Sequence, residues 1–83
     1  MTKIVMYTKE DCPYCVRAKQ LLTAKHLDYQ EIRIDLNPQK REEMERLSGR
    51  RTVPQIFIND QSIGGYDDLF ALAQSGKLTH LLN

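Results

Sequence analysis

Two cysteines separated by a proline and a tyrosine, in KEDCPYCVRA at residues 9–18, are the only cysteines in this 83-residue chain. They follow a short apolar, β-branched run, KIVMY at residues 3–7, which predicts a buried strand. Pro13 suits the first position of a helix, because its missing N–H would have no partner there. The sequence therefore places Cys12 and Cys15 at the start of a helix that directly follows a strand.

Three roles are open to such a pair: a structural disulfide, a metal site and a redox switch. Closing a four-residue loop restricts the unfolded chain by roughly 2 kcal/mol, against more than ~4 kcal/mol for a long loop, so a stabilising disulfide would join distant segments. The two histidines, His26 and His80, lie far beyond Cys15 in the chain, a spacing typical of no compact zinc site, and we expect both at the surface. These arguments favour redox chemistry.

The rest of the chain predicts an α/β domain without repeats or linkers. The first helix is expected to run to about Lys25. Asn37 is a plausible N-cap and Gly49 a terminator of a second helix, which we expect to lie shallowly on the surface. This second helix is expected at 38–48, after a half-exposed strand at 29–36. A hairpin of 55–58 and 61–63, a helix from near Asp67 to Gly76 and a last helical turn follow it. The order β-α-β-α-β-β-α predicts a mixed four-stranded sheet with helices on both faces, as one domain over residues 1–83.

Composition and charge exclude several classes of function. The formal net charge is +1 and hydrophobic residues make up 41% of the chain, which is ordinary for a soluble protein with no attraction to nucleic acid or membranes. The N-terminal residues have no apolar stretch of the kind found in secretion signals. We therefore expect a cytoplasmic protein, and a monomer because no sizeable exposed apolar stripe is evident.

Helix geometry predicts different tasks for the two sulfurs. Cys12 falls at the N-cap, where the first N–H groups of a helix are unpaired and favour a thiolate. Cys15, three residues further on, shares its face and can reach it. We expect Cys12 to be the exposed nucleophile and Cys15 the buried thiol that resolves a mixed disulfide. Lys9 would favour the thiolate, whereas Asp11 would oppose it. A C-x-x-C at this place is typical of thioredoxin-like redox proteins.

YTKEDCPYC, TVPQIFIN and IGGYDDL together resemble the glutaredoxins, particularly the short bacterial dithiol type, over essentially the whole chain. The resemblance implies the thioredoxin fold and a glutathione-dependent thiol–disulfide oxidoreductase. Its implied substrates are protein disulfides and glutathione mixed disulfides, with ribonucleotide reductase as a family-level expectation. Glutathione would be a co-substrate, and no cofactor would be tightly bound.

The resemblance also implies a glutathione-binding site. Pro54 is expected to be cis, which leaves the backbone of Val53 free for the ligand. The γ-glutamyl carboxylate would lie on the amides of Tyr66 and Asp67, with Asp68 receiving its ammonium group. The implied glutathione-binding residues are Lys9, Tyr14, Thr52, Val53, Pro54, Tyr66, Asp67 and Asp68, with Arg50 as a helper.

Two positions depart from many relatives, which have a third cysteine where Tyr66 stands and Ser or Thr at Asp67. An acid at Asp67 is expected to weaken carboxylate binding. Two alternatives remain: reduction by thioredoxin reductase, and a [2Fe–2S] cluster held by Cys12 of two subunits and two glutathiones. TVP and GGYDD argue against the first, and Pro13 argues against the second.

Overall fold

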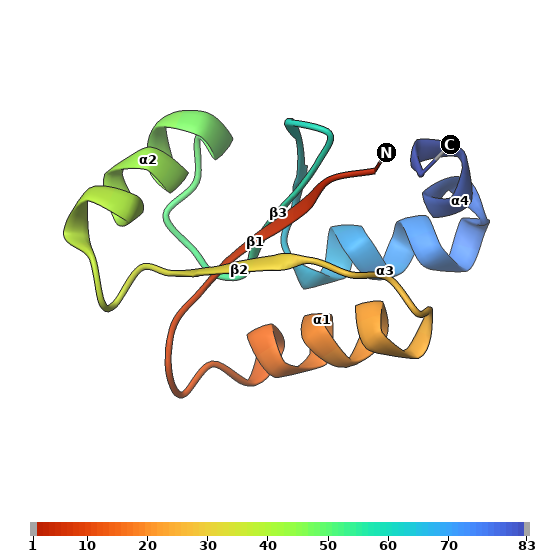
Figure 1. Cartoon of the computed structure of the whole chain (residues 1–83), viewed down its shortest axis with the longest axis horizontal. Helices are drawn as coiled ribbons and strands as arrows, with labels where there is room; N and C mark the ends of the chain where they lie inside the picture. Colours follow the sequence, from red (N-terminus) through yellow and green to blue (C-terminus); the bar gives the residue numbers. More distant parts are fainter. Residues whose placement is uncertain (1, 83) are drawn as a thin grey trace.

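Four strands form one mixed sheet in the order β2-β1-β3-β4 (Figure 1). The structure is a computed structural model, and it describes residues 2–82. The elements along the chain are β1 (Ile4–Thr8), α1 (Pro13–Ala24), β2 (Gln30–Arg33), α2 (Pro38–Ser48), β3 (Gln55–Ile58), β4 (Gln61–Gly64), α3 (Tyr66–Ser75) and α4 (Lys77–Leu81). The predicted order of elements and the final helical turn are confirmed.

Strand directions follow from the connections. β1 pairs in parallel with β2, because α1 carries the chain back across the sheet between them. β1 pairs antiparallel with β3, and β3 forms a hairpin with β4. The predicted parallel pair and the predicted hairpin are both confirmed.

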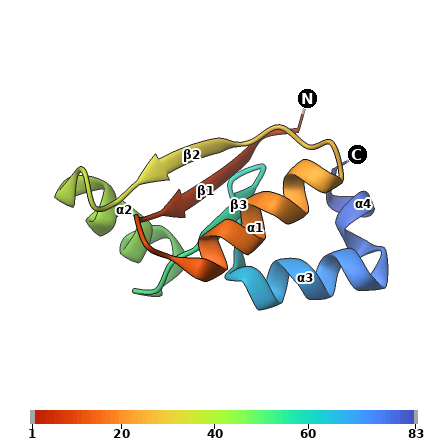
Figure 2. The same cartoon turned by 90° about the horizontal axis from the view of Figure 1, so that it is seen from below.

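The central strand β1 is buried along its whole length and serves two hydrophobic cores. Ile4 and Met6 pack in one core with α1, α3 and α4, whereas Val5 and Tyr7 pack in the other with α2. Alternate side chains of a strand point to opposite faces, so both faces of the sheet need helices to cover them. Figure 2 shows α1 and α3 side by side, and Figure 1 shows α2 across the strands from α1, which agrees with the two cores and confirms the predicted layers.

α2 begins and ends at the predicted residues. The Asn37 side chain accepts a hydrogen bond of 3.0 Å from the Gln39 N–H, Pro38 occupies the first turn, and Gly49 ends the helix with φ of 73°. Only Met44 is buried on this helix, and Leu47 is 51% exposed, as expected for a shallow helix.

The second strand is shorter than predicted. β2 ends at Arg33, and Leu36, the last residue of the predicted strand at 29–36, is 74% exposed. The reason lies in the neighbouring strand. β1 ends at Thr8, whose carbonyl accepts a 2.9 Å hydrogen bond from the Ile34 N–H, and no strand continues beyond it for residues 35–36 to pair with.

The two ends of the described chain meet. The Thr2 hydroxyl donates a 2.6 Å hydrogen bond to the Leu82 carbonyl, next to the beginning of β1. Figure 1 shows the beginning of β1 near α4, away from the turn that joins β1 to α1. Within residues 2–82, no helix has both the length and the apolarity that a membrane span requires.

Candidate active site

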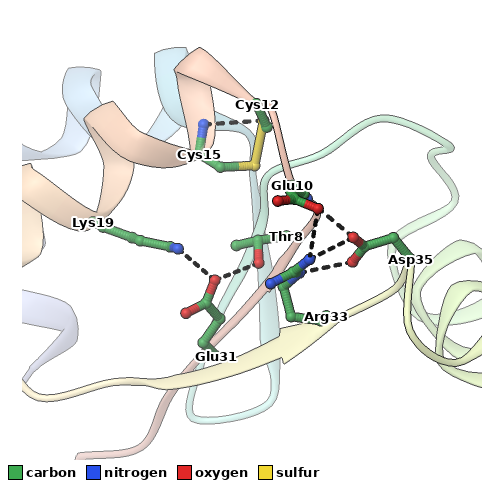
Figure 3. Close-up of polar contacts among 8 residues, drawn as sticks. All are labelled: Thr8, Glu10, Cys12, Cys15, Lys19, Glu31, Arg33 and Asp35. Carbon is green, nitrogen blue, oxygen red and sulfur yellow. Dashed lines mark hydrogen bonds and ion pairs between the residues drawn. A yellow bond between two sulfur atoms is a disulfide. The ribbon is translucent and has the colours of Figure 1, made fainter.

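Cys12 and Cys15 form a disulfide at the first turn of α1 (Figure 3). Cys12 is the N-cap residue, and its Sγ accepts a hydrogen bond of 3.1 Å from the Cys15 N–H. Pro13 and Tyr14 occupy the positions between them, and the two Cα atoms lie 5.2 Å apart. The predicted placement of Cys12 at the N-cap and of Cys15 at the third helical position is confirmed.

The prediction that Cys12 is exposed is wrong for this disulfide form. Cys12 is 8% exposed and Cys15 is 1% exposed, so only their predicted order is correct. Cys12 is covered because its Sγ is bonded to Cys15 and lies 3.8 Å from the Val53 carbonyl oxygen. Two depressions lie beside the pair, one lined by Val53 and one lined by both cysteines.

The first depression is a groove of about 360 Å³ between the loop before β3 and the start of α3. It contains every predicted glutathione-binding residue except Lys9. The groove is lined by Tyr14, Arg50, Thr52, Val53, Pro54, Gly65, Tyr66, Asp67 and Asp68. The Val53–Pro54 peptide bond is cis, as predicted.

Gln55 holds the loop wall of this groove and was missed by the sequence analysis. Its side chain is fully buried, and its Nε2 donates to the Thr52 carbonyl at 3.0 Å and to the Thr52 hydroxyl at 3.2 Å. The buried amide thus fixes the residue that precedes Val53. A glutamine at the start of an otherwise apolar strand, QIFI, was the available signal.

The opposite wall of the groove is the start of α3. Gly65 is the N-cap residue, and the carboxylate of Asp68 accepts a 3.0 Å hydrogen bond from the Gly65 N–H. The same Asp68 oxygen lies 3.1 Å from Arg50 Nη1. The Gly65 N–H, with Arg50 beside it, lowers the pKa of Asp68 despite partial burial. Asp67 in the same turn is exposed.

The second depression is a crevice of about 530 Å³ on the side of β2, and both cysteines line it together with Lys9. Lys9 is therefore beside Cys12 but outside the groove that holds the other predicted residues. Asp11 also lines the crevice and has a φ of 57°. Lys9 and Asp11 thus line the same crevice as the two cysteines, among other charged side chains.

A polar cluster unforeseen from the sequence adjoins the crevice, which its members Lys19, Glu31 and Arg33 line. The carboxylate of Glu31 accepts a hydrogen bond of 2.6 Å from the fully buried Thr8 hydroxyl and lies 2.5 Å from Lys19 Nζ (Figure 3). Burial alone would raise the pKa of Glu31, but the hydrogen bonds from Lys19 and Thr8 outweigh it and lower that pKa. Beside it, the Arg33 guanidinium binds Asp35 through two contacts of 2.7 and 2.5 Å.

Among residues 2–82, no three His, Cys, Asp or Glu side chains are grouped so as to hold a metal ion. His26 and His80 are exposed, as predicted.

A disulfide that caps a helix, next to a cis-proline loop, defines the chain as a thiol–disulfide oxidoreductase of the thioredoxin fold. Residues 4–63 match the glutaredoxin family model. The chain belongs to the glutaredoxin family, and its C-x-x-C pair fits the dithiol type.

Relatives of known sequence and structure agree with this assignment. The chain is 58% identical over 82 residues to glutaredoxin 3 of Escherichia coli K12, which covers 99% of each chain. It is 52% identical over 83 residues to a glutaredoxin of Pseudomonas aeruginosa, which covers 100% of this chain and 99% of the relative.

Two solved structures are closely similar to the fold. The glutaredoxin of Brucella melitensis has a TM-score of 0.86 at 49% identity, over 99% of this chain and 89% of that one. A buckwheat glutaredoxin in complex with glutathione has a TM-score of 0.89 at 32% identity, over 98% of this chain and 76% of that one.

Proposed function

We propose that this protein uses glutathione to reduce protein disulfides and glutathione mixed disulfides through Cys12 and Cys15. The observation that carries the proposal is the groove beside the disulfide. One of its walls is the cis-proline loop and the other is the start of α3, and both offer polar groups to a small peptide. The buckwheat glutaredoxin of similar fold is a complex with glutathione, which supports glutathione as the ligand here.

The peptide backbone and the γ-glutamyl end of glutathione have partners of suitable chemistry in the groove. The backbone of Val53, which no other backbone group among residues 2–82 engages, offers an N–H and a C=O to the ligand backbone, as an edge strand would. The open N–H groups of Tyr66 and Asp67 at the start of α3 suit the γ-glutamyl carboxylate. Asp68 is placed to receive the ammonium group, and Tyr14 and Thr52 complete the walls.

Lys9 would serve the ligand from the other side of Cys12. Its ammonium group, in the crevice that both cysteines line, would attract the glycine-end carboxylate and stabilise a Cys12 thiolate. This role requires the ligand to cross over Cys12 from the groove to the crevice.

The reaction proceeds by two exchanges at Cys12. The Cys12 thiolate, held by the Cys15 N–H, attacks one sulfur of the substrate disulfide; the new bond forms as the other sulfur leaves as a thiolate. In the first route, Cys15 then attacks Cys12 Sγ, which forms the disulfide seen in the structure and releases the reduced substrate. In the second route, glutathione attacks the glutathione sulfur bound to Cys12, which releases oxidised glutathione and the Cys12 thiolate.

The physiological setting follows from the same proposal. We propose a cytoplasmic monomer of one domain, without a tightly bound cofactor, that receives electrons from glutathione. Its substrates would be disulfide-containing or glutathionylated proteins, ribonucleotide reductase among them.

A glutathione-coupled assay on two cysteine variants tests the function. Cys12→Ser is expected to abolish reduction of both cysteine–glutathione mixed disulfide and a protein disulfide, because it removes the nucleophile. Cys15→Ser is expected to spare the mixed disulfide and impair the protein disulfide. Equal loss in both assays would contradict the two routes, and turnover with thioredoxin reductase but not with glutathione would contradict the electron donor.

A further inference from the structure

Three aromatic rings form a continuous strip across α1 and α3. Tyr14 comes from the first turn of α1, and its ring centroid lies 6.2 Å from that of Tyr66 on α3. Tyr66 in turn lies 5.9 Å from Phe70, one turn further along α3. The guanidinium of Arg17, one turn after Tyr14, is 5.2 Å from the Tyr14 ring centroid. We call these four residues the aromatic strip.

The aromatic strip is more exposed than core packing requires. Tyr14 is 52% exposed and Phe70 is 41% exposed. Other residues form the buried faces of the two helices, namely Cys15, Ala18 and Leu22 of α1 and Leu69 of α3. Figure 2 shows the two helices side by side on one face of the sheet. Contiguous exposed aromatic area of this kind marks interaction surfaces, and rings that already contact one another lose little freedom on binding.

Arg17 gives the strip a charge. The side chain is exposed, and among residues 2–82 it forms no ion pair. It stacks on Tyr14 instead, which keeps the guanidinium at the edge of the rings. The strip therefore offers apolar rings with one free cation at its end, which complements an apolar segment that carries a carboxylate.

The strip begins at the redox site and extends beyond the glutathione groove. Tyr14 and Tyr66 line the groove, whereas Phe70 and Arg17 do not. A substrate sulfur that bonds to Cys12 must bring its neighbouring residues over the start of α1, where Tyr14 stands between the two cysteines. With glutathione in the groove, Phe70 and Arg17 remain free for the other partner of a mixed disulfide. The crevice on the other side is lined mainly by charged residues, so it offers no comparable apolar surface.

We propose that the aromatic strip docks the polypeptide segment next to the target cysteine of a glutathionylated protein. The segment would place an aromatic or large aliphatic side chain against Phe70 and Tyr66, and an Asp or Glu near Arg17. This inference rests on the proposed function, because it names the kind of protein substrate that the same site prefers. The strip would select substrates through binding and would take no part in the exchange of sulfur bonds.

Three short synthetic peptides with one glutathionylated cysteine test the proposal. The first has Trp and Asp close to the cysteine, the second has Ser in place of Trp, and the third has Lys in place of Asp. The measurement is kcat/KM for removal of glutathione, with cysteine–glutathione mixed disulfide as the small substrate. We expect the first peptide to be preferred over each of the others by about fivefold to tenfold, the scale of one anchoring side chain at an interface.

Two variants of the aromatic strip and one matched control test which residues cause the preference among the peptides. Phe70→Ser is expected to remove the preference for Trp, and Arg17→Glu to reverse the preference between Asp and Lys. Leu36→Ser changes a residue that is 74% exposed and outside the strip, so its preferences should equal those of the wild type. All three variants should reduce cysteine–glutathione mixed disulfide at the wild-type rate, which also shows that they are folded.

The outcomes separate this inference from the proposed function. Turnover of the small mixed disulfide without any preference among the peptides would overturn the docking proposal alone. A preference that survives in both strip variants would also overturn it. Failure of glutathione to support turnover of any of these substrates would overturn the proposed function, and the docking proposal with it.

Discussion

Arg50 Nη1 lies 3.1 Å from Asp68 Oδ2, and this ion pair joins the segment after α2 to the first turn of α3. The same Asp68 oxygen accepts the Gly65 N–H and so caps α3. Both residues line the groove proposed for glutathione. A ligand ammonium group must therefore share the carboxylate with two partners that are already in place, and a ligand carboxylate can draw Arg50 away.

Asp68→Asn tests this arrangement. The amide keeps an oxygen that can accept from Gly65 but loses the negative charge, so we expect the KM for glutathione to rise by about threefold to tenfold, the usual scale of one charge-assisted hydrogen bond. The kcat at saturating glutathione should change little, because Asp68 does not contact the sulfurs. Steady-state kinetics with varied glutathione provide the measurement, and an unchanged KM would mean that the ammonium group binds elsewhere.

Gly64→Ala is expected to damage both stability and glutathione binding. Gly64 has a φ of 117°, and a Cβ there would meet the Asp68 carboxylate and Arg50 Nη1. Gly49→Ala is the matched control: its φ is 73°, but nothing lies within 4 Å of the added Cβ. We expect the control to lose about 1 kcal/mol of stability with no change in KM. Urea unfolding and steady-state kinetics with varied glutathione, on both variants, provide the measurement. An equal KM for glutathione in the two variants would contradict the expected effect of Gly64 on the groove.

The Glu31 cluster predicts a specific dependence of stability on pH. Because Lys19 and Thr8 hold the pKa of Glu31 below its ordinary value of 4.5, the folded protein binds this proton less readily than the unfolded chain. The stabilisation is thus complete above pH 4.5 and is lost as the pH falls through the lowered pKa. The urea concentration at the midpoint of unfolding should therefore fall less between pH 7 and pH 3 for Glu31→Gln than for the wild type.

The control for this pH prediction is Glu42→Gln, which changes an exposed acid of α2. Within the described residues, the Glu42 side chain forms no hydrogen bond or ion pair. Its midpoint should fall with pH as steeply as that of the wild type. An equally steep fall for Glu31→Gln would show that the cluster contributes nothing to acid sensitivity.

Two residues of α2 should differ sharply in their effect on stability. Met44 is fully buried in the core beneath this helix, whereas Leu47 is 51% exposed. Met44→Ala is expected to lower the free energy of unfolding by about 2–4 kcal/mol, because it leaves a cavity between α2 and the sheet. Leu47→Ala should lower it by about 0.5 kcal/mol or less. Comparable losses in the free energy of unfolding for the two variants, measured by urea unfolding, would contradict the shallow position of α2 on the surface.

Local signals in the sequence predicted most of the fold. Asn37, Pro38 and Gly49 define the ends of α2 through contacts within a few residues, and the C-P-Y-C spacing defines the start of α1. The groove residues came from the resemblance to glutaredoxins, and the structure gathers all of them except Lys9.

The features that the sequence analysis missed depend on distant neighbours. β2 is shorter than its alternating pattern because its one partner strand ends at Thr8. The Glu31 ion pair joins β2 to α1, and the exposure of Cys12 depends on Val53, far away in the chain. Nothing in the local pattern indicates such pairings.

The hydrogen bond between Thr2 and Leu82 has a practical consequence. Since Thr2 and Leu82 lie together at an edge remote from the sulfurs, a fluorescent reporter, an affinity handle or a resin linkage can be attached beyond either residue without blocking the reactive turn. The same proximity would let a short bridge join the old ends, so that a circularly permuted version could be opened at the hairpin tip instead.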